Sequence, residues 1–190
     1  MVLLFVSFIA HGQNDPAKWD PDQLQSLSFA HTFGKLRIAP SQKTLLNRAI
    51  RKALQRWLDT TIDYPAPRSA EQVIAEVRID MIDLDDDRIP EVVAQASDLQ
   101  GGCSATGNCP IWIFKQTIRG YERLLESQGE RIKILASNNE GFHDFLVGVH
   151  ESASEQTLLV YRFRAGEYRR HSCYDRAILL GGGIRVTPCK

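Results

Sequence analysis

Four acidic side chains with regular spacing are the strongest candidates for chemistry in this sequence. They are Asp83, Asp85, Asp87 and Glu91, at relative positions 1, 3, 5 and 9. Calcium is a hard cation that takes six to eight oxygen ligands, and a tight loop with acids at this spacing supplies several of them. The backbone carbonyl of Ile89 is the expected additional ligand. The pattern predicts a calcium-binding loop.

The same loop has a second interpretation, an acidic turn without a metal. Arg88 stands where such loops usually carry glycine. A non-glycine residue at positive φ costs about 1 kcal/mol, which weakens the metal interpretation. Arg88 also carries a positive charge that can neutralise the acidic cluster by itself. Bound calcium and a solvated turn are both compatible with these residues.

No set of side chains in the sequence predicts catalysis. The only candidates are His143, Asp144 and His150, with Glu91 or Asp98 as a second acid. The two histidines are seven positions apart, so on an extended strand they lie on opposite faces. The motifs of serine hydrolases and zinc proteases do not occur. We therefore expect a non-enzymatic protein; the alternative is a small hydrolase whose two carboxylates lie far apart in sequence.

The four cysteines indicate an exported, disulfide-bonded protein. Cys103 and Cys109 bracket a flexible Ser-Ala-Thr-Gly-Asn segment, so a local bridge between them is geometrically easy. Cys173 and Cys189 would then join the last strand or tail to its neighbour, although four cysteines allow three connectivities. A zinc site is the competing interpretation, but the C-x2-C spacing of such sites does not occur.

The N-terminus predicts export as well. Residues 1–10 are almost continuously apolar, and small residues at Ala10 and Gly12 fit a signal-peptidase site before Gln13. We expect a signal peptide over residues 1–12 and a periplasmic or secreted protein. No Lys or Arg precedes the apolar run, and a buried N-terminal strand is the alternative. Ten apolar residues are too few to span a bilayer of about 30 Å as a helix.

The balanced net charge limits the classes of partner that we expect the protein to bind. The 23 basic and 23 acidic residues balance, whereas nucleic acids and anionic membranes attract a net basic face. We expect a protein or a glycan of the cell envelope as the partner, and no stable membrane insertion. Aromatic residues that alternate along predicted strands either pack in the core or form an exposed binding face: Trp112, Phe114, Tyr121, Tyr161, Phe163 and Tyr168.

Periodicity then places these residues on structural elements. Apolar residues four positions apart predict an amphipathic helix over residues 41–59, in an N-terminal extension (13–69) that ends in a Pro-rich linker. Residues 70–190 form the predicted β-rich domain, because short alternating runs follow one another without helical stretches. These runs are Val73–Met81, Glu91–Ala96, Ile111–Phe114, Tyr121–Glu126, Ile132–Ala136, Phe145–Val149, Thr157–Phe163 and Glu167–His171.

A faint internal repeat suggests how the strands are arranged. In both copies an acidic residue opens one strand, an aromatic-aliphatic strand follows, and a Gly turn leads to a Tyr, at Tyr121 and Tyr168. The fold class predicted is α+β: an antiparallel β-meander of two four-strand, propeller-blade-like repeats, with one amphipathic helix packed on it. Two copies cannot close a propeller.

The acidic loop, from Asp83 to Glu91, resembles the D-x-D-x-D loop of FG-GAP or VCBS-type repeats. The Gly/Cys-rich segment 101–109 and the later segments 141–144 and 166–168 resemble a group of uncharacterised bacterial periplasmic proteins. The resemblance covers about half of the chain, from Ile79 to Tyr168. It implies an exported β-rich module.

Together these features predict an exported binding or interaction module, with calcium as a candidate stabilising ion. The Cys103–Cys109 hairpin and the Asp83–Glu91 loop are the expected contact features. A secreted inhibitor of a cell-wall hydrolase, whose bridged hairpin plugs the partner's cleft, is an alternative.

Overall fold

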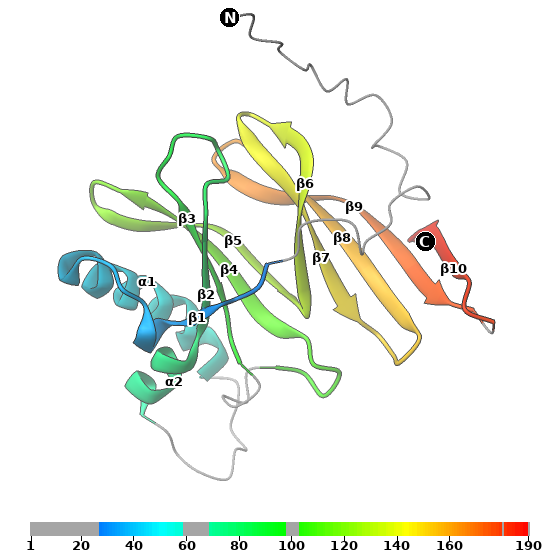
Figure 1. Cartoon of the computed structure of the whole chain (residues 1–190), viewed down its shortest axis with the longest axis horizontal. Helices are drawn as coiled ribbons and strands as arrows, with labels where there is room; N and C mark the ends of the chain where they lie inside the picture. Colours follow the sequence, from blue (N-terminus) through cyan, green and yellow to red (C-terminus); the bar gives the residue numbers. More distant parts are fainter. Residues whose placement is uncertain (1–26, 59–68, 98–102, 180, 190) are drawn as a thin grey trace, which may run out of the picture.

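Two antiparallel sheets of five strands each make up most of the structure, and helices cover the outer face of one of them (Figure 1). The computed structural model describes residues 27–58, 69–97, 103–179 and 181–189. The first sheet has the order β1-β2-β3-β4-β5, and the second has the order β10-β9-β8-β7-β6. Hydrogen-bonded neighbours are consecutive in the chain, so both sheets are meanders.

The described residues form ten strands, five in each sheet, and three helical elements. The first sheet comprises β1 (His31–Thr32), β2 (Arg78–Ile82), β3 (Glu91–Gln95), β4 (Cys109–Thr117) and β5 (Gly120–Gly129). The second comprises β6 (Arg131–Asn139), β7 (Phe142–His150), β8 (Glu155–Arg164), β9 (Glu167–Ile178) and β10 (Ile184–Pro188). The helical elements are the 3-10 turn η2 (Phe33–Lys35), α1 (Pro40–Leu58) and α2 (Ala70–Glu76).

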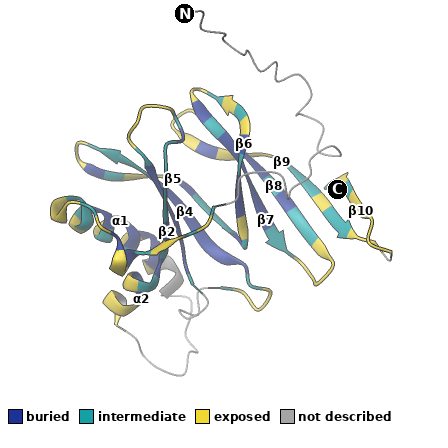
Figure 2. Cartoon of the chain, in the orientation of Figure 1, coloured by how far each residue is buried: buried dark blue, intermediate teal, exposed yellow. Residues whose placement is uncertain are grey.

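The central strands of the first sheet are buried on both faces. All five residues of β3 and the first six of β4 are buried. Successive side chains of a strand point to opposite faces, so Trp112 packs in the core under the helices and Ile113 in the core between the sheets. Figure 2 shows this burial as dark blue along β4. The double burial explains the continuous apolar run in the sequence of β4.

The helix α1 begins one residue before the predicted range of 41–59. Its first residue is Pro40, which is favourable there because the first helical N–H has no intrahelical partner. Its buried face contributes Leu46, Ile50 and Leu54 to the core over the first sheet, and Lys52 on the other face is exposed. Residue 59 lies outside the described residues.

Aromatic residues of the second sheet line the core between the two sheets. Phe142 stacks on Phe163 at 3.9 Å between ring centroids, and Phe145 meets Tyr168 edge-on at 4.4 Å. Such pairs contribute about 0.5–1.5 kcal/mol beyond the area that they bury. Five of the six aromatic residues discussed for the sequence are buried and Tyr121 is half-buried, so they belong to the core and form no exposed binding face.

Two parts of the predicted fold need correction. The expected strand Val73–Met81 begins as the helix α2, because the Ser69 hydroxyl accepts from Gln72 N and the Gln72 side chain accepts from Ser69 N, a capping box that starts a helix. The two four-strand repeats are not confirmed: each sheet has five strands, with β1 and β10 added at the edges, and the sheets form neither a closed barrel nor a propeller. The β-rich class itself is confirmed.

The C-terminal strand β10 is held to β9 by a disulfide as well as by the backbone hydrogen bonds between the two strands. Cys173 on β9 and Cys189 after β10 form a disulfide, and Cys189 N donates to Cys173 O at 3.1 Å.

The predicted signal peptide (1–12) and most of the Pro-rich linker lie outside the described residues. None of the described helices combines the length and apolar character needed to cross a membrane.

Gly129, at the end of β5, lies directly against the backbone of β7 in the second sheet. A Cβ atom there would lie 2.7 Å from the carbonyl oxygen of Gly148 and would also overlap Val147. Gly129→Ala should therefore destabilise the protein by about 1–3 kcal/mol, the usual cost of overpacking. Thermal or urea unfolding measures this. Gly183→Ala is the matched control, since its nearest neighbour would be 3.8 Å away; equal stability of the two variants would contradict the prediction.

Candidate functional site

The acidic loop connects β2 to β3, and its own carboxylates shape it. Asp83 Oδ2 accepts a hydrogen bond from Arg88 N at 2.9 Å, and Asp87 Oδ1 accepts one from Ile89 N at 2.7 Å. Short acidic side chains commonly bond backbone N–H groups in this way in turns. Arg88 has a φ of 69°, the left-handed conformation usual for glycine at this position of a calcium loop.

Three of the four predicted metal ligands come together. Asp83, Asp85 and Glu91 each offer a carboxylate oxygen, and these oxygens lie within 4.8 Å of one another. Asp83 Oδ1 is buried and has no hydrogen-bond partner. Asp87 lies outside this group. A buried acceptor without a partner is costly, so this oxygen is available for a cation.

A lysine from the neighbouring strand already places a positive charge in the loop. The Lys115 ammonium on β4 forms ion pairs with Asp85, with Asp87 at 3.2 Å and with Glu91 at 3.5 Å. It also lies 4.9 Å from the centroid of the Phe142 ring. Lys115 is 24 residues beyond Glu91 in the chain, and the pairing of β4 with β3 brings it to the loop. Sequence spacing within the loop did not point to it.

Burial disfavours the charged form of each of these side chains, whereas hydrogen bonds and ion pairs favour it, so the two effects shift the pKa of each group in opposite directions. Glu91 is 1% exposed, and this burial raises the pKa of its carboxyl, although the bond from Leu84 N favours the charged form. Burial alone would lower the pKa of Lys115, but the hydrogen bonds to Asp85 and Asp87 raise it above its ordinary value. The bond from Ile89 N lowers the pKa of Asp87. The lysine is therefore charged at neutral pH.

The second sheet supports the loop from the other side. His143 N on β7 donates to Leu84 O at 2.7 Å, and the Tyr168 hydroxyl donates to His143 O at 3.0 Å. Burial raises the pKa of Tyr168, so its hydroxyl keeps its proton and remains a donor. His150, at the far end of β7, faces Glu130 at 3.3 Å. The two histidines therefore contact different groups and share no site.

The predicted Cys103–Cys109 bridge is present and closes a short hairpin before β4. Asn108, 6% exposed, fixes this hairpin to the second sheet. Its Oδ1 accepts from His150 N at 2.7 Å, and its Nδ2 donates to His150 O at 2.8 Å. This side chain satisfies both backbone groups of one residue, as a strand neighbour would. The residues at the tip, Ser104, Ala105 and Thr106, are exposed.

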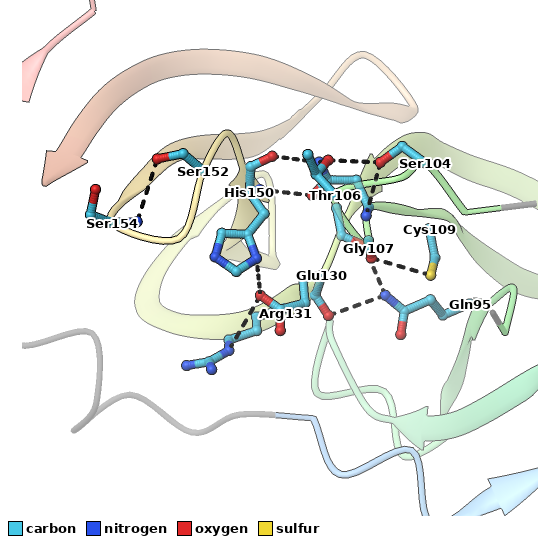
Figure 3. Close-up of polar contacts among 12 residues, drawn as sticks. Gln95, Ser104, Thr106, Gly107, Cys109, Glu130, Arg131, His150, Ser152 and Ser154 are labelled. Atoms are coloured by element: carbon cyan, nitrogen blue, oxygen red, sulfur yellow. Dashed lines mark hydrogen bonds and ion pairs between the residues drawn. The ribbon is translucent and has the colours of Figure 1, made fainter. Parts of the chain in front are cut away.

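A second amide strengthens the same corner. Gln95 is fully buried, and its Nε2 donates to Gly129 O at 3.0 Å and to Glu130 O at 3.2 Å (Figure 3). Neither Gln95 nor Asn108 was singled out from the sequence. The hairpin follows β3 in the chain and the acidic loop precedes it, so the two expected contact features lie at opposite ends of this strand.

In comparisons with known proteins, the chain matches no family model, and neither a curated protein nor a solved structure shows a significant match. The resemblance of the acidic loop to FG-GAP or VCBS-type repeats therefore stays a prediction.

The raised pKa of Glu91 predicts a specific pH dependence of stability. A carboxyl that binds its proton more readily in the folded protein contributes most below its unfolded pKa, ordinarily 4.5, and loses that contribution as pH rises through the folded value. The wild type should therefore gain stability relative to Glu91→Gln as the pH falls from about 7 to about 4. Thermal melts of both proteins across this range measure the difference; parallel curves would contradict it.

Proposed function

We propose that the protein is an exported, non-enzymatic binding module that contacts a protein or glycan of the cell envelope through the Cys103–Cys109 hairpin. Its two disulfides indicate a non-cytoplasmic environment, since cytosolic thiols are kept reduced. The periplasm and the cell exterior both meet this condition. If the partner is a cell-wall hydrolase, the module acts as its inhibitor.

The observation that carries this proposal is a rigid hairpin with an exposed tip. The disulfide closes the loop, and the two Asn108 bonds to His150 hold its base on the second sheet. Ser104 N also donates to Asn108 O at 2.8 Å across the loop. Binding by a preorganised loop loses less conformational entropy than binding by a flexible one. The hairpin therefore offers a contact surface whose shape is already set.

We further propose that the acidic loop binds calcium as a structural ion. Asp83, Asp85 and Glu91 are the carboxylate ligands, Ile89 supplies its carbonyl, and Asp87 lies at the margin of the site. The unpartnered Asp83 Oδ1 and the left-handed backbone at Arg88 support this assignment. The Lys115 ammonium must leave Asp85 and Glu91 for the ion to bind, because like charges repel. Lys115 is therefore a competitor of calcium in this proposal.

A bulky charge at the hairpin tip should abolish partner binding. Ala105→Arg places a long side chain on the exposed tip without touching the buried base. We expect cross-linked capture of the partner from a cell-envelope extract to fall about tenfold or more, as for substitution of an interface centre. Ile118→Arg is the control, because Ile118 is fully exposed in another turn. Capture that survives both Ala105→Arg and loss of the Cys103–Cys109 bridge would contradict the proposed contact surface.

Calcium should raise the melting temperature of the wild type, and more strongly that of Lys115→Met. At a hundred times its dissociation constant a ligand adds about 2.7 kcal/mol to stability. Asp85→Asn is the matched control, since it keeps the Oδ1 acceptor for Asp87 N but removes one ligand charge. An unchanged midpoint at millimolar calcium in both the wild type and Lys115→Met would contradict the metal assignment.

A further inference from the structure

A basic pocket lies on the second sheet, where the β6–β7 and β8–β9 turns meet. It has a volume of about 390 Å³, within the range of small-molecule sites. Its charged lining is dominated by basic residues, with one acidic residue at the rim: Arg162, Arg164, Arg169, Arg170, His171 and Glu140. The Glu140 carboxylate accepts a hydrogen bond from Ala165 N at 2.9 Å and so joins the two turns.

Two of the four arginines face each other across the β8–β9 ladder. Arg162 stands directly opposite Arg169 in the register of the two strands. Like charges at directly opposed positions destabilise a sheet. Four arginines meet three nearby carboxylates, those of Glu140, Asp144 and Glu167, so the guanidinium charges are in excess. An anion bound between the guanidinium groups would relieve this repulsion.

A β-bulge in β9 adds one extra basic residue, His171, to the pocket lining. Consecutive strand residues normally point to opposite faces, yet Arg169, Arg170 and His171 all line the same pocket. The register between β8 and β9 shifts at Val160/Tyr161, opposite this segment. Bulges reorient side chains in this way and are frequent beside functional sites.

A buried carboxylate pairs with one arginine. Asp144 is 1% exposed and accepts hydrogen bonds from Ser137 Oγ at 2.8 Å and from Asn139 Nδ2 at 2.8 Å. Arg162 Nε lies 3.3 Å from Asp144 Oδ2, an ion pair in which Nε makes no hydrogen bond. Arg169 pairs with Glu167 at 2.9 Å. Arg164 and Arg170 have no carboxylate partner among the described residues.

We infer that this pocket binds an oxyanion, the phosphate or carboxylate group of a small molecule or of a glycan. Guanidinium groups bind both kinds of group through two parallel N–H bonds, and such charge-assisted bonds are stronger than neutral ones. Arg162 is the anchor, Arg164 and Arg170 supply the uncompensated charge, and Asp144 is a positioning residue for Arg162. The site is separate from the hairpin and the acidic loop, so it stands or fails independently of the proposed function.

NMR titration of the full chain at constant ionic strength tests the inference. The probes are inorganic phosphate, glucose 6-phosphate, glucuronate and, as the uncharged control, glucose. We expect saturable shifts of β8 and β9 amides with at least one anion and none with glucose. A response to both phosphates identifies phosphate as the ligand group, and a response to glucuronate identifies carboxylate. No saturable shift with any anion at millimolar concentration, or equal shifts with glucose, would overturn the inference.

Variants locate the binding to the pocket. The double variant Arg164→Gln, Arg170→Gln should weaken anion binding by about tenfold or more, since a hydrogen bond to a charged group contributes about 1.5–3 kcal/mol. The control Arg119→Gln, Ile118→Gln changes an exposed turn of the first sheet and should bind as the wild type does. Circular dichroism establishes that the double variant is folded. Unchanged affinity in the folded double variant would overturn the assignment.

Discussion

The burial of the first sheet on both faces is the constraint on which the rest of the structure depends. Helices α1 and α2 cover one face and the second sheet covers the other, so β3 and β4 have few positions open to solvent. Polar groups on such strands need partners inside the protein. Glu91 Oε2 and Gln95 Nε2, on the first and last residues of β3, find them at its two ends. Both proposed contact features are therefore attached to a strand whose five residues are all buried.

The acidic loop illustrates how a protein can supply its own counter-ion. A cluster of carboxylates near a buried strand end is stable only with a positive charge close by. Lys115 provides that charge from β4, held over the Phe142 ring by the aromatic core. The loop thus combines a backbone suited to a metal with an ammonium group that opposes one. In the proposed calcium site, the ion and the Lys115 ammonium would compete for the same carboxylates.

The sequence predicted the local features of this protein better than its long-range contacts. Alternation identified most strands because each has at least one buried face, and the spacing of Cys103 and Cys109 identified a local bridge. The helix α2 was missed because seven residues contain too few turns for a clear period. Lys115, Asn108 and the arginine pocket were missed for a different reason. Each depends on strand register, and register pairs residues that lie far apart in the chain.

The bond between Asn108 and His150 has a mechanical consequence. The hairpin belongs to the chain of the first sheet, while His150 belongs to the second, so a load on the tip is divided between two independently hydrogen-bonded layers. Pulling on the tip would require β4 and β7 to move together rather than one after the other. Tension on the proposed contact at the tip would thus be borne by both sheets and not by a single loop.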